Sequence, residues 1–292
     1  MTLLAEALST LGGVLCTGDT MVAFATCVLA VVIPMGVKQH HRRAPTFAQG
    51  GTFVPAPLIY DLDYKSQFQQ IVPASALEAV IVVVPAAVFS LLGAFDARPK
   101  RVAIAAARVH SLLYAFAATS VTVDCVKKFC GYWRPYFYDE CGFDVATGRC
   151  GGDAPDDANR SFPSGHSALS MVCLLHSSLC LLGAARLGRP LRVFGGAVDV
   201  GGPAVFACLA PAFLALWIAA SRVVDNDHWP ADVVGGATLG AAFALCFYAR
   251  YFPPVFDAAS HEPRPAFLPP PPPGGGASAP ALDGATESPM LA

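Results

Sequence analysis

The sequence predicts an all-α protein whose helices cross a membrane six times. Hydrophobic residues make up 54% of the 292-residue chain and charged residues only 14%, whereas charged residues are usually about a quarter of a soluble domain. The mean hydropathy of +0.51 also indicates an integral, multi-pass membrane protein. The net charge of -2 provides no general attraction for nucleic acid or another polyanion, so any affinity for an anion has to be local.

Six segments are long and apolar enough to span the hydrocarbon core of a bilayer, which takes about 20 residues. They lie at 16–37, 74–95, 102–125, 166–185, 203–221 and 230–249. Pro34, Pro85 and Pro211 fall inside three of these segments, and spanning helices accommodate proline because neighbouring helices satisfy the freed backbone groups. The first segment lacks the basic start of a cleaved signal peptide, so we count it as a span.

The composition changes after residue 253, and this change divides the chain into two parts. Five consecutive prolines at 269–273 are followed by three glycines and small polar residues. Such a segment buries too little apolar area to order itself. We therefore predict one membrane domain over 1–253 and a disordered, Pro- and Gly-rich tail over 254–292. A protein module that binds proline-rich motifs is a candidate partner for this tail, although a tail without a partner is the simpler interpretation.

Lys127 and Arg134 lie where the third span meets the polar stretch that follows it. They are seven residues apart, about two helical turns, so a continuing helix would place them on one face. Pro135 disfavours helix at the residue before it, which puts Arg134 at the helix end. Two cations at a membrane boundary can hold a phosphate, the arginine as a bidentate fork and the lysine as a point charge. Alternatively, they reach towards lipid headgroups.

The segment Pro163-Ser164-Gly165-His166 precedes the fourth span. Ser164 is a good N-cap, and Gly165 lets the backbone approach a ligand. A helix N-terminus offers unpaired N–H groups to an anion, so His166 in the first turn would lie beside it. A histidine at this point can protonate a leaving alkoxide. The alternative is an ordinary capped helix with a satisfied histidine.

Ser221 and Arg222 close the fifth span, and His228 and Asp232 flank the start of the sixth. Pro230 suits the first helical position, which places Asp232 in the first turn. Four residues separate Asp232 from His228, so the carboxylate can reach one imidazole nitrogen and leave the other free to attack phosphorus. The alternative is that Asp232 only complements the helix dipole and His228 is an interfacial residue.

Alternation of the spans brings these segments to one face of the membrane. The ends of spans three and five and the starts of spans four and six would then lie at the same depth. We therefore predict one site for breaking a phosphate ester, and the apolar spans around it indicate a substrate with an apolar tail. Its candidate residues are Lys127, Arg134, Ser164, Gly165, His166, Arg222, His228 and Asp232.

These three segments resemble the signature motifs of the type 2 phosphatidic acid phosphatases (PAP2), also called lipid phosphate phosphatases. Every signature position matches without a gap or substitution. The resemblance covers spans three to six, a catalytic core at about 102–250, whereas the first two spans agree only in number and placement. It implies a helical core like that of PAP2 enzymes and haloperoxidases.

The resemblance implies a metal-independent phosphatase with a phosphohistidine intermediate. His228 would be the nucleophile, Asp232 would orient it, and His166 would protonate the leaving alcohol and then activate water. The groups that would bind the phosphoryl oxygens are Lys127, Arg134, Arg222, the Ser164 hydroxyl and the Gly165 amide. Three fixed cations can stabilise the developing charge, so we expect no metal and no other cofactor. Asp153, Asp156 and Asp157 match no calcium or magnesium loop, and we interpret them as solvated.

The substrates implied by the resemblance are lipid phosphate monoesters. Phosphatidic acid would yield diacylglycerol and phosphate, and lysophosphatidic acid, sphingosine-1-phosphate and ceramide-1-phosphate are further candidates. A lipid or polyprenyl pyrophosphate is the alternative substrate, and a non-catalytic lipid-binding or scaffold relative is the alternative of another class. Membrane lipids are expected partners, nucleic acid is not, and a homo-oligomer remains open.

Charge and cysteines bear on which side of the membrane the site faces. The basic links 96–101 and 186–192 favour a cytosolic position for the opposite face, although three basic residues follow the first span on the catalytic side. A disulfide between Cys141 and Cys150 would suit an extracellular or lumenal loop. Asn159 begins a glycosylation sequon. With the resemblance, we expect the plasma membrane, endoplasmic reticulum or Golgi, with the active site extracellular or lumenal.

Overall fold

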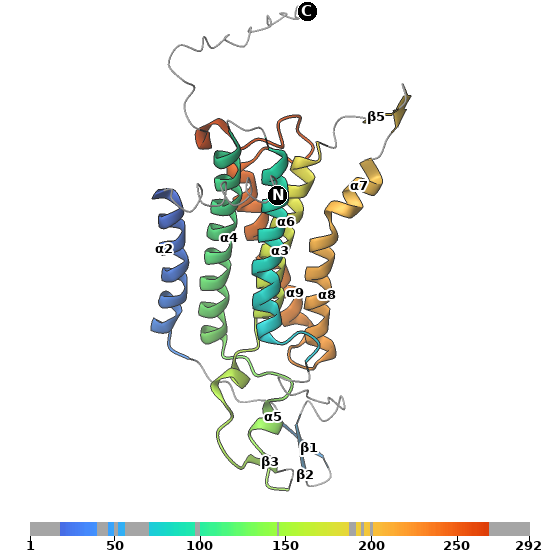
Figure 1. Ribbon diagram of the computed structural model, residues 1–292. Helices are drawn as coiled ribbons and strands as arrows, with labels where there is room; N and C mark the ends of the chain where they lie inside the picture. Colours follow the sequence, from blue (N-terminus) through green and yellow to red (C-terminus); the bar gives the residue numbers. More distant parts are fainter. Residues whose placement is uncertain are drawn as a thin grey trace, which may run out of the picture.

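The computed structural model describes residues 18–39, 46–49, 52–55, 70–96, 100–144, 146–186, 191–193, 196–198 and 201–268. Its body is a bundle of long helices that run roughly side by side (Figure 1). These helices are α2 (Gly18–Val32), α3 (Ala74–Phe95), α4 (Arg101–Cys130), α6 (Gly165–Ala184), α7 (Gly201–Cys208), α8 (Ala210–Val224) and α9 (Pro230–Tyr251). Within the described ranges, four helices are long and apolar enough to cross a membrane, or five if the bent pair α7–α8 forms one span.

Helices occupy all six segments that the sequence predicts as spans, with two departures from a regular helix. The fifth segment is broken next to Pro211, where α7 and α8 meet at 49°, because proline removes a helical hydrogen bond. In the first segment, α2 passes into a 3-10 turn, η1 (Ile33–Gly36), which contains Pro34. The apolar helix there, Met21–Gly36, is shorter than the other candidate spans.

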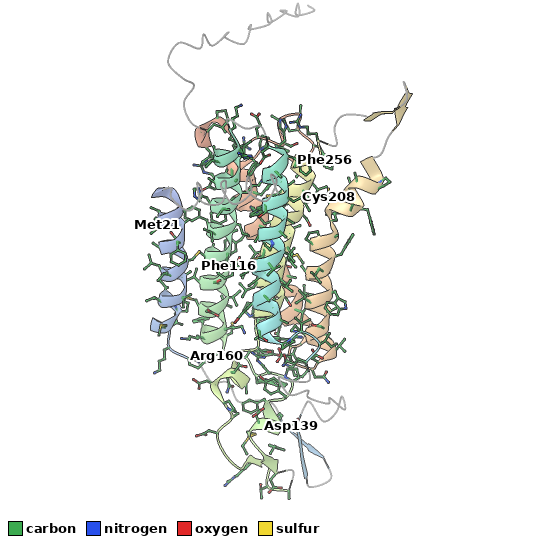
Figure 2. The ribbon with its side chains drawn as sticks, viewed as in Figure 1. Met21, Phe116, Asp139, Arg160, Cys208 and Phe256 are labelled. Carbon is green, nitrogen blue, oxygen red and sulfur yellow. A yellow bond between two sulfur atoms is a disulfide. The ribbon has the colours of Figure 1, made fainter. Side chains whose placement is uncertain are left out.

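Helix α6 lies at the centre of the bundle, against α3, α4, α8 and α9. In α6, 78% of the apolar window is buried, compared with 28% in α3 and in α9. The core beside it contains Leu174 of α6 and Ile218 of α8, both almost fully buried. The outer helices instead expose large apolar side chains such as Met21 of α2 (Figure 2) and Val82 of α3. Lipid would cover these faces in a membrane.

Two glycines let α9 approach α6 closely. A Cβ on Gly236 would collide with the backbone oxygen of Ser164, and a Cβ on Gly240 would collide with that of Ala168. At the end of this contact, the Ser164 N–H donates a hydrogen bond of 2.9 Å to the backbone oxygen of Asp232. The close packing therefore holds the starts of α6 and α9 together, where the candidate residues lie.

The polar insert between α4 and α6 covers the same end of the bundle. It contains α5 (Phe137–Glu140), the antiparallel strands β3 (Phe143–Asp144) and β4 (Arg149–Cys150), and the 3-10 turn η4 (Asp156–Asn159). Figure 2 shows Asp139 and Arg160 of this insert at the opposite end of the molecule from Phe256. Two further antiparallel hairpins pair β1 (Thr46–Gln49) with β2 (Thr52–Pro55) and β5 (Leu191–Val193) with β6 (Gly196–Val198).

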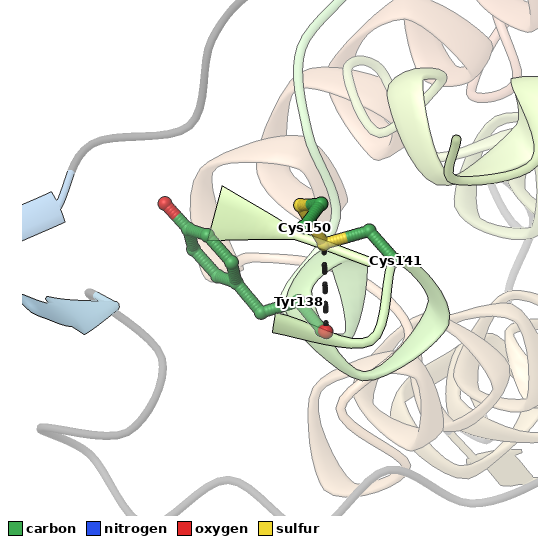
Figure 3. Close-up of a disulfide and its surroundings, with 3 residues drawn as sticks. All are labelled: Tyr138, Cys141 and Cys150. Carbon is green, nitrogen blue, oxygen red and sulfur yellow. Dashed lines mark hydrogen bonds between the residues drawn. A yellow bond between two sulfur atoms is a disulfide. The ribbon is translucent and has the colours of Figure 1, made fainter. Parts of the chain in front are cut away.

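A disulfide joins Cys141 and Cys150 across the base of the β3–β4 hairpin, with the two Cα atoms 5.2 Å apart. The Sγ atom of Cys141 also lies 3.6 Å from the backbone oxygen of Tyr138 (Figure 3). The bridge considered from the sequence is therefore present. Asn159, the first residue of the predicted sequon, is only 4% exposed in the folded insert.

Residues 253–268 pack against the end of the bundle that lies away from the insert. Ser260 is buried, and its hydroxyl donates a 2.9 Å hydrogen bond to the backbone oxygen of Gly183. Phe267, in the 3-10 turn η5 (Pro265–Phe267), stacks on Tyr251 with ring centroids 4.2 Å apart. The stretch in which we place the start of the tail thus has a defined conformation up to residue 268, because these side chains anchor it. The proline run and the rest of the predicted tail lie outside the described residues.

Candidate active site

A cavity of about 470 Å³ opens at the end of the bundle covered by the polar insert. The predicted site residues that line it are Lys127, Arg134, His166 and His228. They come from α4, the insert, α6 and the α8–α9 link, which are separate along the chain. The cavity thus brings two cations and two imidazoles together. Its lining also contains Gln70, Tyr136, Glu140, Asp157 and Asp227.

Lys127 and Arg134 both line this cavity, but they do not lie on one continuous helix as the sequence suggests. Helix α4 ends at Cys130, and Gly131 caps it in the left-handed conformation (φ 54°), which favours glycine. Arg134 therefore does not continue the face of α4, and the prediction of a shared helical face was wrong. The backbone N–H of Arg134 instead donates a 2.8 Å hydrogen bond to the backbone oxygen of Ala158, which fixes its place in the insert.

The Arg134 guanidinium is held by two carboxylates. Its Nη1 lies 2.6 Å from Asp227 Oδ1, and its Nη2 lies 2.9 Å from Asp157 Oδ1. Burial alone would lower the pKa of Arg134, but the nearby Asp227 and Tyr136 raise that pKa above its ordinary value. Arg134 is therefore a permanent cation in the cavity wall.

Arg222 is fully buried and lies behind the cavity wall. Its Nη1 donates a 2.9 Å hydrogen bond to Gln70 Oε1, and its Nη2 lies 2.9 Å from Asp225 Oδ2. The same Nη1 is 3.8 Å from Asp227 Oδ2, so Asp227 stands between Arg222 and Arg134. Arg222, the third predicted cation, thus contributes its charge to the site from behind the side chains that line the cavity.

A left-handed turn after α8 brings His228 to the cavity. Asn226 has φ 54°, a conformation that asparagine tolerates better than most residues. The backbone N–H groups of Asp227 and His228 then both return to the carbonyl oxygen of Arg222, at 3.0 and 3.2 Å. This turn fixes the backbone of His228 directly beside Arg222.

His228 and Asp232 form the contact that their spacing predicts. Nδ1 of His228 lies 3.6 Å from Asp232 Oδ2, and the same carboxylate accepts hydrogen bonds from the Ser161 hydroxyl and from the Trp229 N–H. Asp232, in the first turn of α9, therefore both binds the backbone of the N-cap residue Trp229 and lies beside the imidazole. Burial, together with the cations Arg134 and Lys127, lowers the pKa of His228 well below its ordinary value. The ring is therefore neutral near pH 7, the form in which an imidazole nitrogen is a nucleophile.

The start of α6 carries the remaining candidates, which take up different positions. His166 lines the cavity, and its Nε2 is buried without a hydrogen-bond partner among the described residues. A Cβ on Gly165 would lie 3.7 Å from Lys127 Nζ, so the ammonium group stands over the N-terminus of α6. Two positive features meet there, which favours a bound anion. Ser164 is fully buried outside the cavity lining, where its hydroxyl accepts a 3.4 Å hydrogen bond from the Ser167 N–H and caps the helix.

Several residues of the site were not identified from the sequence. Asp157, interpreted above as solvated, has a side chain that is 61% exposed, yet it pairs with Arg134 and accepts a 3.2 Å hydrogen bond from the Tyr136 hydroxyl. Ser161 and Asp227 were missed as well. Asp227 could have been noticed because it precedes His228, but only the folded chain shows that it lies between two arginines.

The part of the chain that forms this cavity is also the part that is similar to known proteins. Residues 108–255 match the family model described as the PAP2 superfamily. The chain is 30% identical to lipid phosphate phosphatase 2 of Arabidopsis thaliana over 227 residues, which cover 74% of this chain and 73% of the relative. It is 29% identical to diacylglycerol pyrophosphate phosphatase 1 of Saccharomyces cerevisiae over 194 residues, covering 62% and 64% of the two chains. No solved structure matches the chain.

Proposed function

This chain belongs to the PAP2 superfamily, and we propose that it is a membrane phosphatase that removes phosphate from phosphatidic acid and similar lipid monoesters. The observation that carries this proposal is the convergence of His166, His228, Lys127 and Arg134 on one cavity. Phosphoryl transfer depends mainly on positioning and on stabilisation of charge, and this set of side chains can supply both.

The proposed reaction has two steps. Nε2 of neutral His228 attacks phosphorus, the bond from phosphorus to the ester oxygen breaks, and His166 gives the leaving alkoxide a proton. His166 then takes a proton from water, the resulting hydroxide attacks the phosphohistidine, and the P–N bond breaks to release phosphate. Asp232 stabilises the positive charge that develops on the His228 ring, because its carboxylate lies 3.6 Å from Nδ1.

The phosphoryl oxygens need cations throughout both steps. Lys127 and Arg134 line the cavity, and Arg222 lies close behind it. The N-terminus of α6 at Gly165 adds backbone N–H groups. We propose that these fixed charges take the place of a divalent metal, so the reaction proceeds without one.

Phosphatidic acid is favoured over a pyrophosphate lipid by the other charges of the cavity. Among the described residues, the charged side chains that line it besides Lys127 and Arg134 are acidic: Glu140, Asp157 and Asp227. A second phosphate group would therefore meet carboxylates, which repel it. A pyrophosphate lipid remains the alternative substrate, as the name of the yeast relative indicates.

We propose six spans with the cavity on the extracellular or lumenal face. Helix α2 and η1 together comprise 19 residues, which extend over about 30 Å, the thickness of a bilayer core. They lie alongside α4 (Figure 1), so they complete a sixth span. The Cys141–Cys150 disulfide on the cavity side is typical of an oxidising compartment.

Phosphate release by the purified full chain tests this function. Hydrolysis of phosphatidic acid should persist in EDTA, should exceed that of a pyrophosphate lipid, and should vanish in His228→Ala without loss of the cooperative thermal transition. Complete inactivation by the chelator would contradict the metal-free mechanism. Binding of phosphatidic acid without any release of phosphate would instead favour a non-catalytic lipid-binding protein.

A further inference from the structure

Asp227 holds a central position among the charges of the cavity. Its Oδ1 lies 2.6 Å from Arg134 Nη1, and its Oδ2 lies 3.8 Å from Arg222 Nη1. The same Oδ2 is 3.6 Å from Nε2 of His228, the nitrogen that does not face Asp232. Asp227 also lines the cavity. Its carboxylate therefore touches both arginines and the reactive side of the imidazole.

A phosphoryl group needs the same place. For attack by His228, phosphorus has to come within about 3 to 3.5 Å of Nε2. Its oxygens have to reach the guanidinium groups at hydrogen-bond distance. With Asp227 Oδ2 already 3.6 Å from Nε2 and Oδ1 bound to Arg134, the carboxylate occupies the volume that the phosphoryl oxygens would take. Two anions this close repel each other, so the carboxylate and the phosphate exclude one another.

The two arginines keep other partners if Asp227 moves away. Arg222 remains bound to Asp225, which is fully buried and is also held by the backbone N–H of Ile71 at 2.9 Å. Arg134 remains bound to Asp157 at 2.9 Å. Asp227 is therefore the exchangeable anion of the set, since its departure leaves neither guanidinium without a carboxylate. In the resting protein it offsets the repulsion among the buried cations, which are costly to bury unpaired.

We propose that the Asp227 carboxylate is an internal competitor of the phosphoryl group for Arg134 and Arg222. A phosphate ester binds as the Asp227 side chain turns aside, and the returning carboxylate expels the orthophosphate product. This inference rests on the proposed function, because it concerns the same cavity. It adds that the affinity of the cavity for a phosphate dianion is held down by an internal carboxylate.

Neutral and charged replacements of Asp227 distinguish two roles for its carboxylate. It either competes with phosphate for the arginines or holds the arginines in position. Asp227→Asn removes the charge and keeps the shape, Asp227→Ala removes both, and Asp227→Glu is the matched control that retains the charge. The first readout is binding of orthophosphate to the purified full chain by calorimetry. The second is the KM and kcat for phosphatidic acid.

We expect both neutral variants to bind orthophosphate about ten- to thirtyfold more tightly, because the phosphate no longer has to displace a carboxylate from Arg134, and a hydrogen bond to a charged group has an effect of about this size. Their KM should fall without a rise in kcat, and Asp227→Glu should bind no more tightly than the wild type. Unchanged or weaker binding in a folded neutral variant would overturn the proposal and make Asp227 a support for the arginines. Failure of the proposed function would appear separately, as a wild-type protein that binds orthophosphate but hydrolyses no lipid phosphate.

Discussion

Replacement of Asp232 by asparagine separates two roles that its carboxylate combines. The carboxylate accepts a 3.0 Å hydrogen bond from the Trp229 N–H, which caps α9, and it lies 3.6 Å from Nδ1 of His228. The asparagine side-chain oxygen can still accept from Trp229, so the cap should survive. The negative charge beside the imidazole is lost, and with it the stabilisation of the positive charge that phosphorylation of His228 creates.

The size of the effect follows from this distance. Two unit charges 3.6 Å apart interact by about 4 to 5 kcal/mol at an effective dielectric constant of about 20. We therefore expect Asp232→Asn to lower kcat by about a thousandfold or more, with KM nearly unchanged. The assay is phosphate release from phosphatidic acid in detergent micelles, with thermal unfolding as the measure of the fold. A kcat within tenfold of wild type in a folded variant would show that Asp232 serves only as a helix cap.

Two further predictions concern stability. Gly240→Ala should destabilise the protein by about 1 to 3 kcal/mol and lower its Tm, because the added Cβ overpacks α9 against α6. Gly202→Ala is the control and should leave the Tm unchanged, because a Cβ there would meet no described atom within 4 Å. Equal Tm values for the two variants would contradict close packing at Gly240. Because the pKa of His228 is lowered in the folded protein, the unfolded chain takes up this proton first, so the contribution of His228 to the free energy of unfolding should be constant above about pH 6.5 and fall by up to about 1.4 kcal/mol per pH unit below it. In chemical denaturation, His228→Gln should reduce the slope of the acid limb by the amount that one proton contributes, and an unchanged slope would argue against a buried, neutral imidazole.

The long helices and the end of the bundle at which the candidate residues gather could be predicted, because both depend on local sequence. Apolar runs of sufficient length define α3, α4, α6 and α9. Ser164 and Pro230 mark the starts of α6 and α9 because capping and proline geometry depend on neighbouring residues only. Alternation of the spans then suffices to bring the histidines to one end of the bundle.

Other features depend on contacts between distant segments, which a single sequence does not reveal. Arg134 reaches the cavity because Gly131 ends α4 and because the backbone oxygen of Ala158, 24 residues further along the chain, accepts a hydrogen bond from the Arg134 N–H. Asp227 lies between Arg134 and Arg222, which belong to segments far apart in the sequence. The packing of residues 253–268 depends on Ser260 meeting Gly183, so composition alone gave too early a start for the tail.

These observations also explain why the cavity combines strong cations with carboxylates. Lys127, Arg134 and Arg222 lie close together in a largely buried site, and such a cluster is unstable unless anions offset it. Asp157 and Asp225 are permanent partners in this view, and Asp227 alternates with the substrate. Affinity for phosphate is thereby balanced against release of the product.

The central claim is that His228 carries the phosphoryl group during turnover, and rapid quenching of the reaction tests it most directly. Wild-type protein mixed with phosphatidic acid labelled in its phosphate should yield an acid-labile, base-stable label within the first turnover. Peptide mapping should locate the label at His228, and His228→Gln should acquire none. A label on another residue, or hydrolysis by His228→Gln at the wild-type rate, would contradict the account.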